Sequence, residues 1–211
     1  MESQPVADAS SRVAGIILAG GLSRRMGGGD KSLLEIGGRP MLSTVIDRLE
    51  AQARPVALNA NGDPMRFAHF RLPVFADPID GNIGPLAGVL GGMRWAQENS
   101  TARRIVTISA DTPFFPRNLV ERLTVGLGDM EIAVARSDGR SHPVVGLWPV
   151  ELAGDLELWL RDAAHRKAES WVRSRRYVEV TFGRDEGFDP FFNVNTPQDR
   201  AIADGLAEKA S

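Results

Sequence analysis

Cysteine is absent from this chain of 211 residues, which excludes disulfide scaffolds, thiol nucleophiles and cysteine-ligated zinc sites. An excess of charge of one sign is also missing, because 25 Lys and Arg residues nearly balance 27 Asp and Glu residues. A chain of net charge −2 carries no global field that attracts nucleic acid. No apolar run approaches the ~20 residues of a membrane span, and the first one follows a polar, acidic stretch unlike a secretory signal. We therefore expect a cytoplasmic protein that binds neither nucleic acid nor a membrane.

Glycine, by contrast, is abundant: the chain has 22 glycines, where about 15 would be usual at a frequency of ~7%. Their distribution is uneven, since 14 of the 22 lie in the first 92 residues and eight of these lie between Gly15 and Gly38. Glycine allows positive φ and lets backbone N–H groups approach a ligand closely. The excess therefore indicates that the backbone near the N-terminus has a specific use.

The order of elements along the chain predicts the fold class. Residues 1–12 are polar and small, which predicts a flexible tail, and 13–211 have the length of one domain. Short apolar runs predict strands at residues 13–18, 55–58, 72–75, 104–108, 131–135, 144–148 and 177–182. Helical spacing predicts helices at residues 40–49, 84–99, 116–125, 149–161 and 165–173, and from 196 onward. This alternation predicts an α/β, Rossmann-like three-layer sandwich, a mostly parallel sheet with helices on both faces. The strand-rich region between residues 130 and 190 leaves room for an antiparallel edge strand.

Polar residues follow the first four predicted strands. The glycine-rich loop follows the first, and Asn59, Asp77 and Asp111 follow the next three. In open α/β sheets a ligand binds outside the carboxyl ends of the strands. If these strands are parallel neighbours, we expect all of these residues to face one crevice.

The glycine-rich loop fits neither of two common phosphate-binding motifs. A Walker A loop needs glycine directly before its lysine, and Asp30 stands before Lys31. A dinucleotide fingerprint needs G-x-G-x-x-G after the strand, which residues 18–23 do not supply. Arg25 and Lys31 favour a third kind of phosphate loop, the alternative being a flexible turn with solvated arginines.

The loop does resemble the fingerprint of a known enzyme family. Residues 18–31 read Leu-Ala-Gly-Gly-Leu-Ser-Arg-Arg-Met-Gly-Gly-Gly-Asp-Lys, similar to nucleotidyltransferases and most similar to the molybdenum cofactor guanylyltransferase (MobA-like) family. Further segments resemble that family in its order: Val56–Asn61, Gly84–Gly88, Asp111–Pro113, His142-Pro143 with Leu147-Trp148, and Asn193–Pro197. The resemblance covers nearly the whole chain and implies the nucleotide-diphospho-sugar transferase type of fold. The Leu-Ala-Gly-Gly opening favours the guanylyl members over cytidylyl relatives, which are expected to read Leu-Ala-Ala-Gly.

The resemblance also implies a reaction. The terminal phosphate of molybdopterin, with or without molybdenum, would attack the α-phosphorus of GTP, forming the guanine dinucleotide cofactor and releasing pyrophosphate. The expected cofactor is Mg²⁺, which binds one or two carboxylates together with phosphates and water. The N-terminal half would hold GTP and Mg²⁺ and the C-terminal half molybdopterin. Molybdenum-insertion proteins and recipient molybdoenzymes are the further partners implied.

Site residues follow from the resemblance, position by position. Catalytic roles fall to Arg25, Lys31 and Asp111, and Asp111 is also the metal ligand. The predicted nucleotide contacts are Leu18, Ala19, Gly20, Gly21, Lys31, Asn59, Asp77 and Asp111. The predicted molybdopterin contacts are Gly28, Gly84, His142, Asn193 and Asn195.

Simpler roles stay open for several of these residues. Asp111 has an alternative role as a helix cap before Thr112-Pro113, and Asn59 and Asp77 stand in good turn sequences. Loop, helix lead-in or packing roles are the alternatives for His142, Asn193, Asn195 and Gly84. The alternative activities are cytidylyl transfer to molybdopterin, nucleotidyl transfer to a sugar or polyol phosphate, and a non-catalytic nucleotide-binding regulator.

Overall fold

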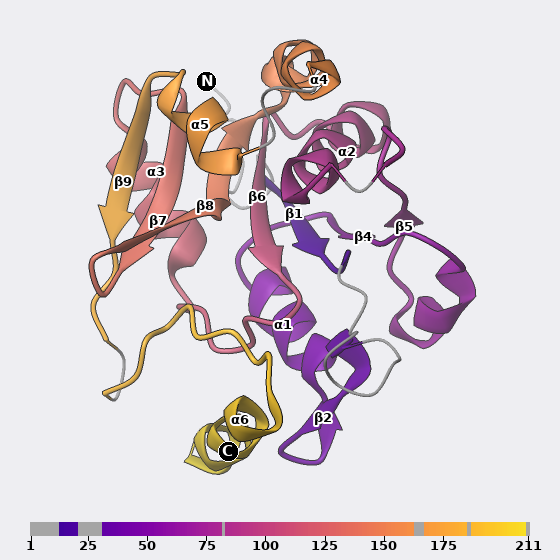
Figure 1. The fold of residues 1–211 in the computed structure, drawn as a ribbon, viewed down its shortest axis with the longest axis vertical. Helices are drawn as coiled ribbons and strands as arrows, with labels where there is room; N and C mark the ends of the chain where they lie inside the picture. The colour runs from indigo at the N-terminus through magenta and orange to yellow at the C-terminus, as the bar shows by residue number, and fades with distance from the viewer. Residues whose placement is uncertain (1–12, 21–30, 82, 163–166, 185–186, 210–211) are drawn as a thin grey trace, which may run out of the picture.

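The computed structural model describes residues 13–20, 31–81, 83–162, 167–184 and 187–209. The predicted tail and most of the glycine-rich loop lie outside these residues. The described part is built on a seven-stranded sheet of order β5-β4-β1-β6-β8-β7-β9 (Figure 1).

Four parallel strands form one half of the sheet. They are β5 (Val74–Phe75), β4 (Val56–Asn59), β1 (Val13–Leu18) and β6 (Arg104–Ser109). All six residues of β1 are buried, as expected of a strand covered on both faces. The carboxyl ends of these four parallel strands therefore meet at one edge of the sheet, as the sequence predicted.

The other half of the sheet contains the antiparallel strand. The strands β7 (Ile132–Ser137) and β8 (Arg140–Pro149) form a hairpin, and β9 (Tyr177–Thr181) runs parallel to β7. Asp138 and Gly139 make the turn with φ of 45° and 75°, as tight hairpins require. The expected antiparallel edge strand is thus an interior strand, because β8 also pairs with β6.

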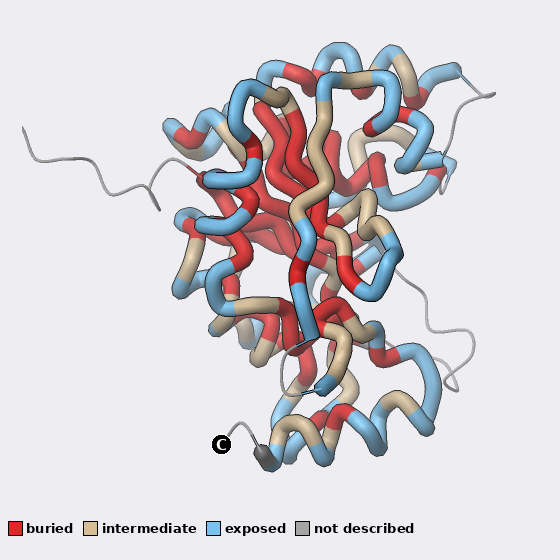
Figure 2. The backbone as a smooth tube through the Cα atoms, turned by 90° about the vertical axis from the view of Figure 1, so that its left-hand side faces the viewer, coloured by how far each residue is buried: buried red, intermediate tan, exposed pale blue. Residues whose placement is uncertain are grey.

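Helices cover both faces of the sheet. On one face lie α1 (Met41–Glu50) and α3 (Leu119–Leu127), and on the other lie α2 (Pro85–Asn99), α4 (Ala153–Arg161) and α5 (Ala168–Arg173). Figure 2 shows the buried strands in the middle, enclosed by elements that turn their exposed sides outward. The predicted α/β three-layer architecture is confirmed. None of the helices in the described ranges combines the length and apolarity that crossing a membrane demands.

A small subassembly lies beyond the carboxyl ends of the parallel strands. The hairpin β2 (Glu35–Ile36) and β3 (Arg39–Pro40) packs there with α6 (Pro197–Lys209) around Met41, Phe114 and Val194 (Figure 1). The sequence predicted the helix from residue 196, but it predicted a glycine-rich loop where the β2–β3 hairpin forms. The hairpin forms because Gly37 and Gly38 turn with φ of 57° and 77°, and the Gly37 N–H donates to Asp204.

The described residues also include three 3-10 helices: η2 (Lys31–Leu33), η3 (Pro64–Phe70) and η4 (Val150–Leu152). The sequence did not predict η3. Its N-cap is Asp63, whose carboxylate accepts the Met65 N–H at 2.9 Å, and the helix buries Phe67.

The sequence pattern indicated no role for Gly91 and Gly92, two adjacent glycines in α2. A Cβ at Gly91 would lie 2.9 Å from the Phe75 ring, and one at Gly92 would lie 2.8 Å from Ile16. Both distances are shorter than side chains tolerate, so these glycines let α2 lie close against the sheet. That close packing brings the N-terminus of α2 to the strand ends.

Candidate active site

A cavity of about 280 Å³ lies at the carboxyl ends of the parallel strands. Its walls come from the segments after β1, β4, β5 and β6, from the start of α2, and from η2 and β8. The lining residues are Leu18, Ala19, Gly20, Ser32, Asn59, Asn61, Asp77, Gly84, Pro85, Gly88, Ser109, Ala110, Asp111 and Val144. The strand order thus gathers residues that lie up to 126 positions apart in sequence.

One wall of the cavity is an amide–carboxylate network. The buried Asn59 side chain donates from Nδ2 to Asp77 Oδ1 at 3.0 Å. Asn61 donates from Nδ2 to Asp77 Oδ2 at 2.7 Å and accepts the Asp77 N–H at 2.8 Å. Both Asp77 oxygens are therefore oriented by amide donors. They keep lone pairs that suit N–H and O–H donors of a base or a sugar.

Asn61 was not among the predicted site residues. The sequence held a signal, since Asn61 lies in the Val56–Asn61 segment two residues after Asn59. A strand places residues two apart on one side, and the turn after β4 continues that arrangement far enough to reach Asp77.

The start of α2 forms the adjoining wall. Gly84 is the N-cap of α2 with φ of 104°, and the N–H groups of a helix N-terminus favour anions. Gly88 lies one turn further, where a Cβ would overlap the Asn59 side-chain oxygen and approach Leu18 Cδ2 to 2.9 Å. Glycine at 88 is what allows Asn59 to lie against the helix.

Asp111 stands at the floor of the cavity, two residues after the end of β6. Ser109 donates from Oγ to Asp111 Oδ1 at 2.6 Å. The helix-cap alternative for Asp111 is wrong, because the next helix, α3, begins at Leu119 with Asn118 as its N-cap. Its carboxylate therefore does not cap a helix.

The C-terminal segment is tied to the Asp111 loop. Val194 donates its N–H to the Asp111 carbonyl at 2.9 Å, and the buried Thr112 donates from Oγ1 to Asn193 Oδ1 at 2.6 Å. Asn193, which is 82 positions from Asp111, therefore lies beside the cavity floor. Asn195 instead leads into α6, where its N–H donates to Asp199 at 2.9 Å.

Asp111 could supply one carboxylate ligand to a divalent metal ion whose other ligands come from elsewhere. Among the described residues there is no group of three or more His, Asp or Glu side chains that could hold a metal by themselves. Mg²⁺ commonly binds through one or two carboxylates, with phosphate oxygens and water as the remaining ligands. Asp111 offers such a carboxylate.

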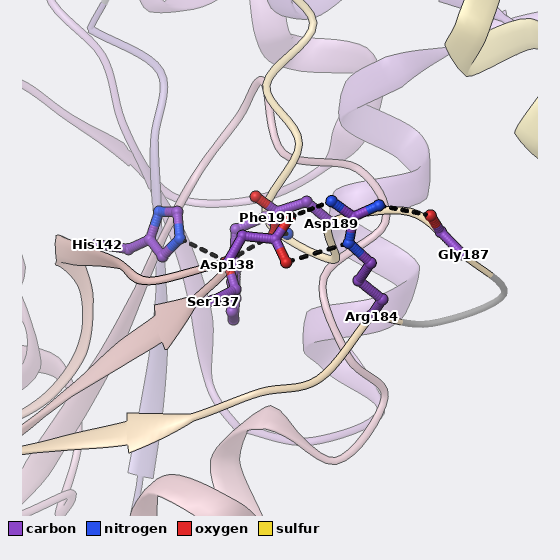
Figure 3. Close-up of polar contacts among 7 residues, drawn as sticks. All are labelled: Ser137, Asp138, His142, Arg184, Gly187, Asp189 and Phe191. Carbon is purple, nitrogen blue, oxygen red and sulfur yellow. Dashed lines mark hydrogen bonds and ion pairs between the residues drawn. The ribbon is translucent and has the colours of Figure 1, made fainter.

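His142 makes a separate polar cluster on the neighbouring strand β8. Its Nε2 lies 2.8 Å from Ser137 Oγ, and Ser137 Oγ donates to Asp189 Oδ1 at 2.6 Å (Figure 3). Burial lowers the pKa of His142 below its ordinary value of 6.5, against the negative charge of Asp189, which raises it, while Arg140 lowers it further. His142 does not line the cavity, but Val144, two residues along β8, does.

The predicted site residues divide by location. The structure brings together in the cavity Leu18, Ala19, Gly20, Asn59, Asp77, Gly84 and Asp111. Gly21, Arg25 and Gly28 lie outside the described residues, as does the side chain of Lys31, whose backbone opens η2. His142, Asn193 and Asn195 lie outside the cavity lining, with the contacts given above.

Comparisons with known proteins agree with this arrangement. The MobA-like NTP transferase domain matches residues 15–180. A molybdenum cofactor guanylyltransferase from Rhodopseudomonas palustris (strain HaA2) is 54% identical over 195 residues, covering 91% of each chain. One from Mesorhizobium japonicum is 46% identical over 200 residues, covering 93% of this chain and 96% of its own.

Solved structures share the fold at lower identity. Molybdopterin-guanine dinucleotide biosynthesis protein A from Archaeoglobus fulgidus has a TM-score of 0.74 at 19% identity, covering 93% of this chain and 99% of its own. A CMP:2-keto-3-deoxy-manno-octonic acid synthetase has a TM-score of 0.71 at 14% identity, covering 95% of this chain and 100% of its own. These likenesses confirm the predicted nucleotidyltransferase fold. With a family match over most of its length and close relatives at nearly full coverage, the chain belongs to the MobA-like NTP transferase family.

Proposed function

We propose that this protein transfers GMP from GTP to the terminal phosphate of molybdopterin, forming the guanine dinucleotide cofactor and releasing pyrophosphate. The observation that carries the proposal is the cavity in which Asn59, Asp77 and Asp111 meet. It occurs in a chain whose relatives at 54% and 46% identity are named molybdenum cofactor guanylyltransferase. Residues 13–211 would act as one domain, with the nucleotide held by the N-terminal half and molybdopterin by the C-terminal half.

The nucleotide end of the site is the wall formed by Asn59 and Asp77. Their oxygens are acceptors, so they match the N–H donors of guanine and the hydroxyl groups of ribose. The backbone of Leu18, Ala19 and Gly20 would pass along the nucleotide, since glycine allows such a close approach. We expect these acceptors to favour GTP over CTP, because guanine offers a ring N–H beside its amino group, whereas neutral cytosine offers only an amino group.

The reacting phosphates would lie over Asp111. Asp111, held by the Ser109 hydroxyl, would hold a Mg²⁺ ion, which when bound neutralises charge on the phosphate oxygens. Lys31 and Arg25 would orient the triphosphate and stabilise the negative charge of the departing pyrophosphate. An oxygen of the molybdopterin phosphate forms the new bond to the α-phosphorus, and the bond from the α-phosphorus to the bridging oxygen of pyrophosphate breaks.

Molybdopterin would bind on the side of β8 and the C-terminal segment. Asn193 accepts from Thr112 through its amide oxygen, which leaves its amide nitrogen as a donor for the acceptor substrate. Gly28, Gly84, Asn195 and His142 would complete this side. Molybdenum-insertion proteins and recipient molybdoenzymes would meet the protein in the cytoplasm.

Product analysis tests the proposal directly. Purified protein is mixed with Mg²⁺, molybdopterin and GTP, and the dinucleotide is identified by mass spectrometry while pyrophosphate release is followed. CTP in place of GTP, and sugar or polyol phosphates in place of molybdopterin, test the alternative activities. Faster turnover with CTP would overturn the guanylyl assignment. GTP binding without pyrophosphate release would favour a non-catalytic regulator.

A further inference from the structure

Three segments that are remote in sequence meet at His142. Ser137 ends β7, His142 lies near the start of β8, and Asp189 belongs to the segment that leads to α6. Ser137 is buried, and its hydroxyl touches both the imidazole and the carboxylate, at 2.8 Å and 2.6 Å (Figure 3). The Phe191 ring lies against the imidazole in a tilted arrangement with ring centroids 4.8 Å apart, so the imidazole is held by a hydrogen bond and by a ring contact.

The hydrogen-bond directions in this cluster are fixed by counting protons. Asp189 Oδ1 also accepts the Phe191 N–H at 2.9 Å, so this oxygen acts as an acceptor, and the Ser137 hydroxyl must donate to it. A hydroxyl has a single proton to donate. Ser137 Oγ can therefore only accept from His142, which places the imidazole proton on Nε2 and leaves a lone pair on Nδ1.

A second set of contacts fastens the carboxylate segment to the β7–β8 hairpin. Arg184 donates to both carboxylate oxygens of Asp138, at 3.1 Å and 2.9 Å, and to the Gly187 carbonyl at 3.2 Å (Figure 3). A two-point arginine–carboxylate pair is geometrically restrictive. It holds the Asp189 segment against the turn next to Ser137.

From this geometry we infer that Ser137 and Asp189 are positioning residues that hold His142 as the Nε2–H tautomer. Nδ1 then accepts a hydrogen bond from an N–H or O–H donor of the acceptor substrate. The inference rests on the proposed function for the identity of that substrate. His142 lies on β8 two residues before Val144, which lines the cavity. The acceptor substrate would reach it from the cavity.

The charges around His142 select which part of the substrate faces it. Burial, the largest effect, and Arg140 lower the pKa of His142, while Asp189 raises it. Arg184 and Asp138 neutralise each other nearby. A neutral imidazole with an outward lone pair repels an oxyanion and attracts a proton donor. The ring of His142 therefore contacts the N–H-bearing heterocycle of molybdopterin rather than its phosphate.

The first test is spectroscopic and needs no substrate. Long-range ¹H–¹⁵N correlation spectra of histidine-labelled protein report which ring nitrogen carries the proton, and the chain has only three histidines. We expect a pure Nε2–H tautomer at His142. The Ser137→Ala change should yield a mixture of tautomers. Asp189→Asn, whose amide oxygen can accept the same two hydrogen bonds, should keep the tautomer and lower the pKa of His142.

The second test uses two substitutions, each of which places an amide atom near the position of one ring nitrogen. His142→Asn places an amide oxygen near the Nδ1 position, and His142→Gln places an amide nitrogen near the Nε2 position. We expect His142→Gln to raise KM for molybdopterin about tenfold, because one hydrogen bond is lost. His142→Asn should keep KM for molybdopterin close to the wild-type value. KM for GTP and the melting temperature should stay near wild type in both.

The outcomes separate the inference from the proposed function. A wild-type proton on Nδ1, or a pure Nε2–H tautomer retained in Ser137→Ala, would overturn the roles of Ser137 and Asp189. Wild-type KM in His142→Gln together with a raised KM in His142→Asn would overturn the role of Nδ1. If wild-type protein makes no dinucleotide from GTP, the proposed function fails. In that case the tautomer measurement still decides how His142 is held.

Discussion

Gly88 offers a sharp test of how the nucleotide wall is built. Alanine at this position would place a methyl group 3.0 Å from Asn59 Cγ and 2.9 Å from Leu18 Cδ2. Asn59 is 3% exposed, so its side chain has no solvent to rotate into. We expect Gly88→Ala to displace the Asn59 amide and to break its 3.0 Å hydrogen bond to Asp77.

The expected magnitudes follow from three effects. Alanine gains about 1 kcal/mol of helix propensity over glycine, overpacking costs about 1–3 kcal/mol, and a lost hydrogen bond costs about 0.5–1.5 kcal/mol. The fold should therefore lose about 0.5–3.5 kcal/mol. GTP affinity should fall about tenfold, the equivalent of ~1.4 kcal/mol, because the displaced amide no longer meets the base.

Gly92→Ala is the matched control. It lies one turn further along α2, and its methyl group would meet Ile16 at 2.8 Å and Ile105 at 3.2 Å, away from the cavity. We expect a similar loss of stability in urea unfolding with unchanged GTP affinity by calorimetry. Equal GTP affinity in Gly88→Ala and wild type would refute the reasoning, as would an equal loss of GTP affinity in both variants.

Three further outcomes are expected. Asp111→Asn should lower pyrophosphate release at least about 10²-fold, the usual loss when a group that stabilises transition-state charge is removed. Its urea midpoint should stay near wild type, and a wild-type rate would show that the Asp111 carboxylate is dispensable. Asn61→Ala removes two hydrogen bonds from Asp77 and should raise KM for GTP about fivefold with little change in kcat; a lowered kcat at constant KM would contradict this positioning role. Because burial lowers the pKa of His142 from 6.5, the unfolded chain binds the proton first, and His142 should cost stability as pH falls below about 6.5. When urea unfolding is measured at about pH 7 and pH 5, the free energy of unfolding should fall less in His142→Asn than in wild type. An equal fall in both proteins would refute the His142 contribution.

Local patterns in the sequence determined the parallel half of the sheet and the position of the cavity. The apolar run at Val13–Leu18 encodes a strand buried on both faces, and the alternation with helices makes its neighbours parallel. The carboxyl ends of parallel strands share one edge. For that reason Asn59, Asp77 and Asp111 could be placed in one crevice before the fold was known. Their roles in binding GTP and Mg²⁺ stay predictions.

Only the tertiary structure decided the contacts between remote segments. The interior place of β8 depends on its pairing with β6, which no local pattern encodes, and the contact of Asn61 with Asp77 depends on the neighbouring turns. The β7–β8 hairpin and the returning C-terminal segment meet at one end of the sheet. This meeting brings together Ser137, His142 and Asp189. Residue type and spacing determine short-range geometry. Strand order and packing determine the contacts between distant residues, such as the one between Ser137 and Asp189, which lie 52 positions apart in the sequence.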